Sequence, residues 1–300
     1  MKTQSERQEP LLSQQQLSWL LFIVLAVIWG SSFMLIQIGL KVYSPLQVAS
    51  LRLSSAFVAI SFLGIRFFRQ TPPAKLRLLL LSGFLGSFFP AFLFAFAQTH
   101  INSSIAGILN SLTPFFTFLI GAAFFRQQVS WLKVVGLLIG LLGAVSIFLV
   151  KGSEGLSIDA YALLVVVATI CYACNVHIVK TYLSDIKPLH LSAVSLTMVG
   201  GIAFLYLLST DFVQVTQQRP DSFYPLLSVV FLGVSSTAFA LVLFNRLLQL
   251  SSALFASSVT YFIPIVAVFW GLVFNESFFW WHLLGMLAII VGVFIVNRSK

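Results

Sequence analysis

Ten runs of mostly apolar residues, each about twenty residues or longer, follow one another along the chain and constrain its fold more than any other feature. Each run can cross a hydrocarbon core of about 30 Å as an α-helix that rises about 1.5 Å per residue. The runs lack the polar–apolar alternation of membrane β-barrel strands. We predict an all-α membrane protein with ten transmembrane helices, numbered runs 1 to 10, at residues 17–39, 45–68, 76–98, 103–125, 130–150, 158–180, 188–209, 224–248, 252–274 and 278–297.

The composition agrees with a chain that faces lipid over most of its surface. Hydrophobic residues make up 59% of the chain and charged residues only 8%, where soluble domains carry about 25% charged residues. The formal net charge is +9, but the basic residues lie in short segments between the runs instead of in stripes with interleaved aromatics. We therefore expect the lipid bilayer as a partner and no nucleic acid.

The distribution of Lys and Arg predicts the orientation, because cytoplasmic loops of membrane proteins are enriched in both. With the N-terminus in the cytoplasm, the three outside positions are Lys41, Lys151 and Arg219. The thirteen inside positions are Lys2, Arg7, Arg66, Arg69, Lys75, Arg77, Arg126, Lys133, Lys180, Lys187, Arg246, Arg298 and Lys300. This bias supports ten spans and predicts that both termini are cytoplasmic.

The segments outside the runs are short. Residues 1–16 are polar and are expected to form a disordered cytoplasmic tail. The longest polar gap, from Thr210 to Ser222, leaves no room for a nucleotide-binding domain, and the chain has no G-x-x-x-x-G-K loop. An ATP-driven pump within this chain is excluded, and we expect no cofactor.

An internal repeat relates the two halves of the chain. A shift of 143 positions places Trp29 on Tyr172, Ser32 on Asn175 and Pro45 on Pro188. A shift of 150 positions places Ala106, Pro114, Gly121 and Trp131 on Ala256, Pro264, Gly271 and Trp281. Each half, 17–150 and 151–300, then holds five spans, and an odd number inverts the second half relative to the first. Inverted repeats are typical of secondary transporters, whose two halves exchange conformations around a central site.

Several strings resemble the EamA-type transporters of the drug/metabolite transporter superfamily over roughly residues 20–297. In the first half they are Trp29-Gly30-Ser31-Ser32-Phe33, Ser44-Pro45, Leu51-Arg52 and Ser111-Leu112-Thr113-Pro114; in the second they are Phe244-Asn245-Arg246, Pro264 and Asn275-Glu276. The resemblance implies ten helices in two inverted repeats in the inner or plasma membrane, and export of small metabolites such as amino acids. This chain has Arg126-Gln127 where the first half of the family usually has Gly-Glu.

Polar and small residues at helical spacing mark a candidate substrate site. In run 4 the stripe is Ala106, Asn110, Thr113, Thr117 and Gly121, and in run 3 it is Gly83, Ser87, Pro90, Phe94 and Gln98. Such stripes face protein or water and not lipid, so close helix packing is the alternative. Pro114 and Pro264 remove backbone donors at mid-span, which either frees carbonyls for a ligand or only kinks the helix.

Aromatic residues and one arginine complete the candidate site. Trp29, Tyr172 and Tyr261 offer aromatic surface for a substrate or a gate, although packing is the commoner role of such residues. Arg52 is the one basic residue well inside a run, and no Asp or Glu lies deep in any run. Arg52 must therefore reach water, bind carbonyls, or meet an anionic group of a substrate. The predicted substrate-binding residues are Trp29, Ser32, Arg52, Phe94, Gln98, Asn110, Pro114, Tyr172, Asn175, Tyr261 and Pro264.

Two function classes remain. The first is a secondary carrier that exports a small polar or amphipathic metabolite by alternating access. The second is a non-transporting receptor or assembly protein on a transporter scaffold, which would not need polar stripes that converge from several spans. The runs hold no cluster of His and carboxylates and no activated nucleophile, so we expect no enzyme, no catalytic residue and no metal site. The sequence leaves the oligomeric state and the substrate open, and His177 is the deepest titratable candidate for proton coupling.

Overall fold

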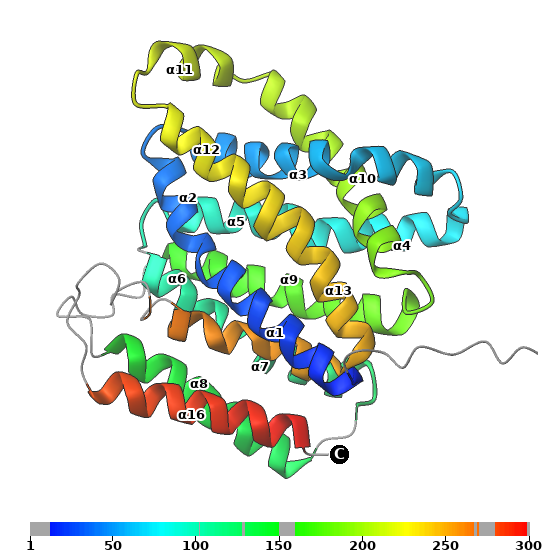
Figure 1. Ribbon diagram of the computed structural model, residues 1–300, viewed down its shortest axis with the longest axis vertical. Coiled ribbons are helices and arrows are strands. Elements are labelled where there is room, and N and C mark those ends of the chain that lie inside the picture. The colour runs from blue at the N-terminus through cyan, green and yellow to red at the C-terminus, as the bar shows by residue number, and fades with distance from the viewer. Residues whose placement is uncertain are drawn as a thin grey trace, which may run out of the picture.

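The computed structural model describes residues 13–101, 103–127, 130–149, 160–266, 269 and 280–298. Within them the chain is helical and contains no β-strand, which confirms the all-α prediction. Figure 1 shows the helices, which are α1 (Gln14–Gly30), α2 (Ser32–Leu40), α3 (Pro45–Phe68), α4 (Pro73–Gly83), η1 (Phe84–Phe88), α5 (Phe89–Ala97), α6 (Ser103–Asn110), α7 (Thr113–Phe124), α8 (Trp131–Leu149), α9 (Ala160–Tyr182), α10 (Pro188–Leu208), α11 (Phe212–Gln218), α12 (Phe223–Phe231), η2 (Leu232–Phe239), α13 (Ala240–Leu250), α14 (Ala253–Ser257), η3 (Ser258–Phe262), α-helical residues 263–266, and α16 (Trp280–Arg298).

The first helix begins earlier than the sequence predicted. The Ser13 Oγ accepts the backbone N–H of Gln16 at 3.2 Å, and the Gln16 side chain accepts the N–H of Ser13 at 2.8 Å. This reciprocal capping box starts α1 at Gln14. The predicted disordered tail of residues 1–16 is therefore corrected at its end, and residues 1–12 lie outside the described part of the chain.

Seven helical segments of the described chain are long and apolar enough to cross a membrane. They are Gln14–Leu40, Pro45–Phe68, Pro73–Ala97, Ile105–Phe124, Ala160–Tyr182, Pro188–Leu208 and Phe223–Leu250. The other three predicted runs contain the shorter apolar helices Trp131–Gly143, Ala253–Val266 and Leu283–Val296. The sequence prediction of ten spans is thus matched by seven helices of spanning length, and the remaining three stay a prediction.

Runs 3 and 8 are interrupted by π-helical segments, η1 and η2. Such segments occur mostly within α-helices and are frequent at functional sites. Both begin at the same short string, Phe84-Leu85-Gly86 in run 3 and Phe231-Leu232-Gly233 in run 8, 147 positions apart. The string thus recurs with the internal repeat.

Runs 4 and 9 change conformation at their prolines. Pro114 has no N–H for the carbonyl of Asn110, four residues earlier, and that carbonyl instead accepts the Thr113 hydroxyl at 2.7 Å. Pro264 leaves the carbonyl of Thr260 free in the same way, and the Ser111 hydroxyl donates to it at 3.3 Å. The carbonyls that the two prolines free are therefore satisfied by the protein's own hydroxyls.

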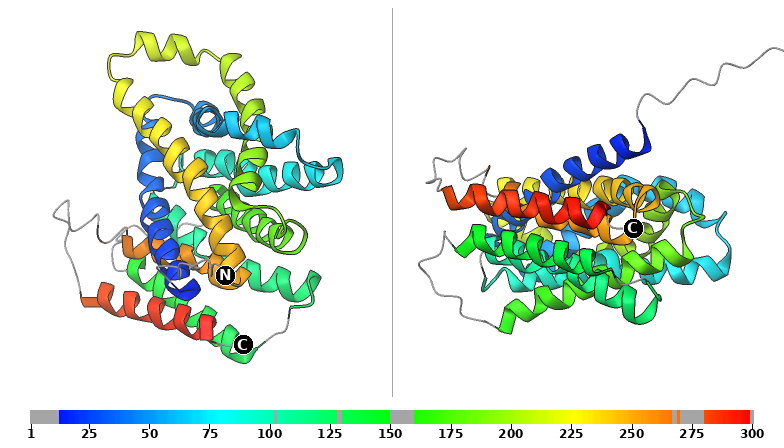
Figure 2. Two further views of the ribbon diagram at one scale, coloured as in Figure 1. Left: turned by 45° about the vertical axis from the view of Figure 1, so that its right-hand side comes forward. Right: turned by 90° about the horizontal axis from the view of Figure 1, so that it is seen from below.

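The helices pack in pairs that join the two halves of the chain. α3 packs along α10, and α8 along α16 at one edge of the molecule (Figures 1 and 2). α1 lies against α13, and α5 and α7 lie against α9. Glycines permit the close approach of α8 and α16: a Cβ on Gly136 would lie 2.8 Å from the Gly292 carbonyl oxygen, and a Cβ on Gly292 would lie 2.6 Å from that of Gly136.

The described chain begins and ends on the same side of the molecule. In Figure 1 the first residues of α1 lie beside the last residues of α13, on the side where α16 also ends. Same-side ends are what an even number of crossings requires.

Candidate functional site

A cavity lies at the centre of the helices, and its atom-free space of about 870 Å³ includes space that is open to solvent. Its walls come from runs 1, 2, 3, 4, 6, 8 and 9, so both halves of the chain contribute. Seven of the eleven predicted site residues line it, namely Trp29, Ser32, Arg52, Phe94, Asn110, Tyr172 and Asn175.

The other four predicted residues lie outside the cavity. Tyr261 is buried, its ring packs over Gly140 and its hydroxyl donates to the Leu137 carbonyl at 3.1 Å, so it faces α8. Gln98 ends α5, where its carbonyl accepts the Gln37 side chain at 3.0 Å.

The two prolines do not line the cavity either. Pro114 is the second residue of α7, and Pro264 follows η3. Both shape the backbone beside the cavity and leave the wall to their neighbours Thr113 and Ile263.

The sequence did not predict the wall formed by run 8. Ser236 and Thr237 of η2 and Leu241 and Phe244 of α13 line the cavity. The repeated Phe-Leu-Gly string carries the missing signal, because a shift of 147 places Phe94 of run 3 on Leu241. The repeat described from the sequence relates runs 1, 2, 4 and 5 to the second half and does not include run 3.

Arg52 brings the cavity its positive charge. Its Nε–H donates to the Thr237 Oγ1 at 2.8 Å, which is the one hydrogen bond of the guanidinium to a described residue. A guanidinium has five N–H donors and stays protonated in proteins. No Asp or Glu of the described chain lines the cavity, so Arg52 has no carboxylate partner there.

Hydroxyls of several runs offer lone pairs to the cavity. Ser32, Thr113, Ser257 and Thr260 all line it, and each donates its proton to a backbone carbonyl three or four residues earlier. A hydroxyl that donates in this way keeps its acceptor capacity. The polar wall is therefore rich in neutral acceptors.

Aromatic rings form the apolar wall. Phe94 stacks on Tyr172 with ring centroids 6.3 Å apart, and it meets Phe33 edge-on at 5.5 Å. Trp29 packs against Phe244 at 5.2 Å, and its indole N–H donates to the Ser236 carbonyl at 3.0 Å. This wall suits an apolar group of a ligand.

The lower part of the polar stripe of run 4 packs on α9 and does not face the cavity. The carbonyl of Thr117 lies 2.7 Å from the His177 Nε2, and the His177 ring stacks on Phe125 with centroids 4.7 Å apart. Both alternatives for the run 4 stripe therefore apply in part. Asn110 and Thr113 line the cavity, as a substrate site requires, and Thr117 takes part in helix packing.

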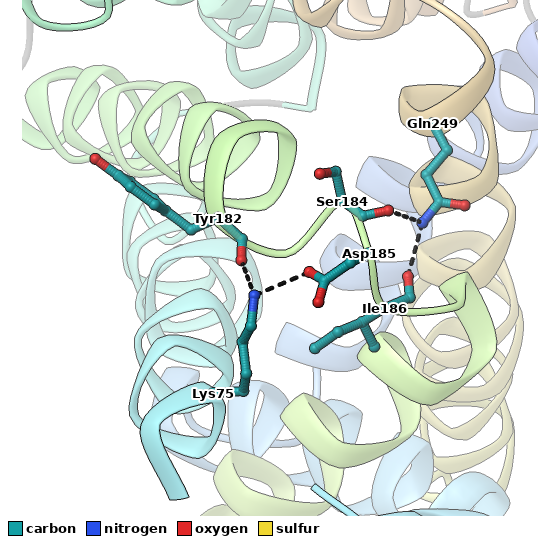
Figure 3. Close-up of polar contacts among 6 residues, drawn as sticks. All are labelled: Lys75, Tyr182, Ser184, Asp185, Ile186 and Gln249. Atoms are coloured by element: carbon teal, nitrogen blue, oxygen red, sulfur yellow. Dashed lines mark hydrogen bonds and ion pairs between the residues drawn. The ribbon is translucent and has the colours of Figure 1, made fainter. Parts of the chain in front are cut away.

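A cluster of polar contacts surrounds the loop that connects α9 to α10 (Figure 3). The Lys75 Nζ, from α4, donates to the Tyr182 carbonyl at 2.6 Å and to the Asp185 carboxylate at 2.9 Å. The Gln249 side chain, from α13, donates to the Ile186 carbonyl at 2.7 Å. The hydrogen bond from Lys75 lowers the pKa of the Asp185 carboxyl. We call this cluster the α9–α10 clasp.

Comparison with known proteins gives one family. A model described as the EamA-like transporter family matches residues 16–149 and again residues 160–298. An uncharacterized transporter of Archaeoglobus fulgidus is 30% identical over 288 residues, which cover 94% of this chain and 99% of that protein.

Two further relatives carry more specific names. A probable terminal-alkyne amino-acid exporter of Streptantibioticus cattleyicolor is 25% identical over 92% of both chains. A probable amino-acid metabolite efflux pump of Salmonella typhimurium is 24% identical over 92% of this chain and 93% of that protein. A crystal structure with 13% identity superposes with a TM-score of 0.71 over 93% of this chain and 96% of the other, which supports the fold alone.

Proposed function

Because the chain belongs to the EamA-like transporter family, we propose that it is a secondary carrier that exports small amphipathic metabolites, amino acids and related carboxylates, by alternating access. Its family and its apolar helices make it a multi-pass protein of the cell membrane. The relatives named as amino-acid exporters support the substrate class.

One observation carries the proposal: Arg52, the one cation among the described lining residues, shares a central cavity with neutral acceptors and an aromatic wall. A guanidinium binds a carboxylate through two parallel hydrogen bonds. The lone pairs of Thr113 and Ser257 suit an N–H or O–H donor next to that carboxylate. Phe94 and Tyr172 suit an apolar side chain. A receptor would not need a cavity whose walls come from both halves of the chain.

We also propose the finer topology. The chain would form two inverted five-helix repeats, 17–150 and 151–300, with ten spans and both termini in the cytoplasm. The two family matches, the pairing of α3 with α10 and of α8 with α16, and the Lys and Arg bias support this arrangement.

The test is efflux from proteoliposomes loaded with a mixed pool of labelled amino acids and related carboxylates. We expect protein-dependent efflux that Asn110→Leu reduces at least tenfold, since leucine removes the amide from the cavity wall. Phe62→Leu is the control, because Phe62 is 82% exposed on the outer face of α3. An inert wild-type protein would favour the receptor or assembly alternative.

A further inference from the structure

The charges around the cavity are unbalanced, and this limits the net charge of a ligand. Arg52 is the one Lys, Arg, Asp or Glu among the described residues that line the cavity. The described carboxylates are Asp185, Asp211 and Asp221, all between helices. Asp185 pairs with Lys75, and Asp211 accepts the Gln47 side chain at 2.8 Å. The described lining of the cavity thus carries one positive charge.

A bound zwitterion would leave that charge in place. Its carboxylate neutralises Arg52, but its ammonium adds a second cation that finds only neutral oxygens such as those of Thr113 and Ser257. Burial of an ion without a counter-ion is costly. Phe94 and Tyr172 stack on each other, so one face of each ring is not free for a cation.

A monoanion with a neutral donor fits every part of the wall. Its carboxylate pairs with Arg52, a hydroxyl or amide N–H beside the carboxylate donates to the hydroxyl oxygens, and the loaded cavity is neutral. Resting on the proposed function, we propose that the carrier prefers monoanionic carboxylates with a neutral donor at C2, such as 2-hydroxy acids, over zwitterionic amino acids. Its transport then moves one negative charge per molecule.

The charge of such a substrate gives export its direction. An inside-negative membrane potential drives an anion outward, and for one charge about 59 mV sustains a tenfold gradient. A carrier of this kind exports its substrate with no proton-coupling acid in the cavity.

The experiment compares two probes of the same skeleton, 2-hydroxy-4-methylpentanoate and leucine, which differ at C2 by a hydroxyl in place of the ammonium group. Proteoliposomes receive a potassium diffusion potential of about 120 mV, which sustains about a 100-fold gradient of a monoanion. We expect the hydroxy acid to accumulate when the interior is positive, to be excluded when it is negative, and to enter about tenfold faster than leucine. Protein-free vesicles correct for leakage.

Variants connect the charge preference to Arg52. Arg52→Gln should abolish the potential-driven accumulation, and Arg52→Lys should keep it because the charge remains. Arg66→Gln, on an exposed position of the same helix, should behave as wild type. Glu276→Gln should leave the order of the two probes unchanged; Glu276 lies outside the described residues. If Arg52→Gln fails to fold, the comparison of the two probes in the wild type and in Arg52→Lys still tests the charge preference.

The outcomes separate this inference from the proposed function. Leucine transport as fast as hydroxy-acid transport, or hydroxy-acid uptake that ignores the potential, overturns the charge preference and leaves the carrier proposal standing. Inactivity toward both probes and toward the mixed pool overturns both. A Glu276→Gln variant that reverses the probe order identifies Glu276 as the counter-charge and also overturns the inference.

Discussion

The indole N–H of Trp29 donates to the main-chain carbonyl of Ser236 at 3.0 Å, across 207 positions of the sequence. This bond ties the end of α1 to η2, the π-helical wall of the cavity that is formed by the second half of the chain. Because both residues line the cavity, the bond fixes the shape of the site where the two halves meet.

We predict that Trp29→Phe, which keeps an aromatic ring and removes the donor, lowers the free energy of unfolding by about 1 kcal/mol, the typical net value of one hydrogen bond. Transport should fall more than this loss of stability alone would cause, since the hydrogen bond that holds η2 to α1 is lost. Thermal unfolding in detergent and efflux from proteoliposomes measure the two effects. Trp19→Phe is the control, because Trp19 packs on Phe22 and Phe255 and its indole nitrogen has no hydrogen-bond partner among the described residues. Equal effects at both positions would contradict the prediction.

The contact between α8 and α16 predicts a strong effect of one methyl group. A Cβ on Gly292 would lie 2.6 Å from the Gly136 carbonyl oxygen, a backbone atom that cannot rotate away. Gly292→Ala should therefore cost about 1–3 kcal/mol, as overpacking does. Gly201→Ala is the matched control, because its nearest neighbour, a ring carbon of Phe57, would lie 3.8 Å away. Similar melting temperatures for the two variants would show that the helix pair is not tightly packed in the folded protein.

The α9–α10 clasp predicts that Lys75 matters more than its acidic partner. Asp185→Asn removes an ion pair whose carboxylate side chain is 65% exposed, and solvent screening limits such pairs to roughly 0–1 kcal/mol. Lys75→Gln also removes the bond to the Tyr182 carbonyl and should destabilise the protein more. Melting temperatures of both variants decide the order.

The pH dependence of the clasp follows from the direction of the pKa shift. The hydrogen bond from Lys75 lowers the pKa of Asp185, so the contribution of the pair to stability is complete above the unfolded-state pKa of about 3.9. It is lost only as the pH falls through the lower folded-state pKa. The difference in melting temperature between wild type and Asp185→Asn should stay constant from pH 5 to 8 and shrink below about pH 4.

The proposed topology places residue 300 in the cytoplasm and the turn before α12 outside. After Cys171 and Cys174 are replaced by Ala, a single cysteine at Lys300 should react with an impermeant maleimide only in inverted vesicles. A cysteine at Asp221 should react in intact cells and not from the inside of the membrane. Labelling of residue 300 from outside would contradict the count of ten spans.

The apolar runs were readable from the sequence because they depend on local composition, although α1 and α4 begin three residues before the predicted runs 1 and 3. Run 2 was predicted at 45–68 and α3 is Pro45–Phe68, with Ser44 and Gln47 forming the capping box that starts it. Trp29, Arg52 and Asn175 were placed in a common site through polarity inside apolar runs and through the repeat.

Contacts that depend on helix type and on partner helices were not readable. Tyr261 was predicted in the site only as aromatic surface; it lies in a 3₁₀ segment, and its ring packs over Gly140 on the side of α8. Ser236 and Thr237 of the π-helical η2 line the cavity, and no local pattern of serines and threonines predicts a π-helix. The partner of the Asn110 carbonyl, Thr113, becomes clear only once Pro114 is placed in the helix.

The last prediction concerns proton coupling. His177 was the deepest titratable candidate, and its Nε2 lies 2.7 Å from the Thr117 carbonyl while its ring stacks on Phe125. It does not line the cavity, so a proton on it has no direct contact with a substrate there. We therefore expect His177→Gln to keep most of the transport activity, since the glutamine amide also donates to a carbonyl.

A proton gradient should for the same reason change transport little. The measurement is substrate accumulation in proteoliposomes with the membrane potential clamped at zero and a pH difference of about two units, a driving force of roughly 2.7 kcal/mol. With the potential absent, substrate should only equilibrate between the two sides. His177→Phe, which keeps the ring stack and removes the hydrogen bond, separates a structural role from a titrating one, because it should lower the melting temperature and leave the response to pH unchanged. Uphill accumulation that an uncoupler abolishes and that His177→Gln lacks would instead make His177 the proton carrier, acting through the Thr117 carbonyl on the helix that also carries Thr113 into the cavity.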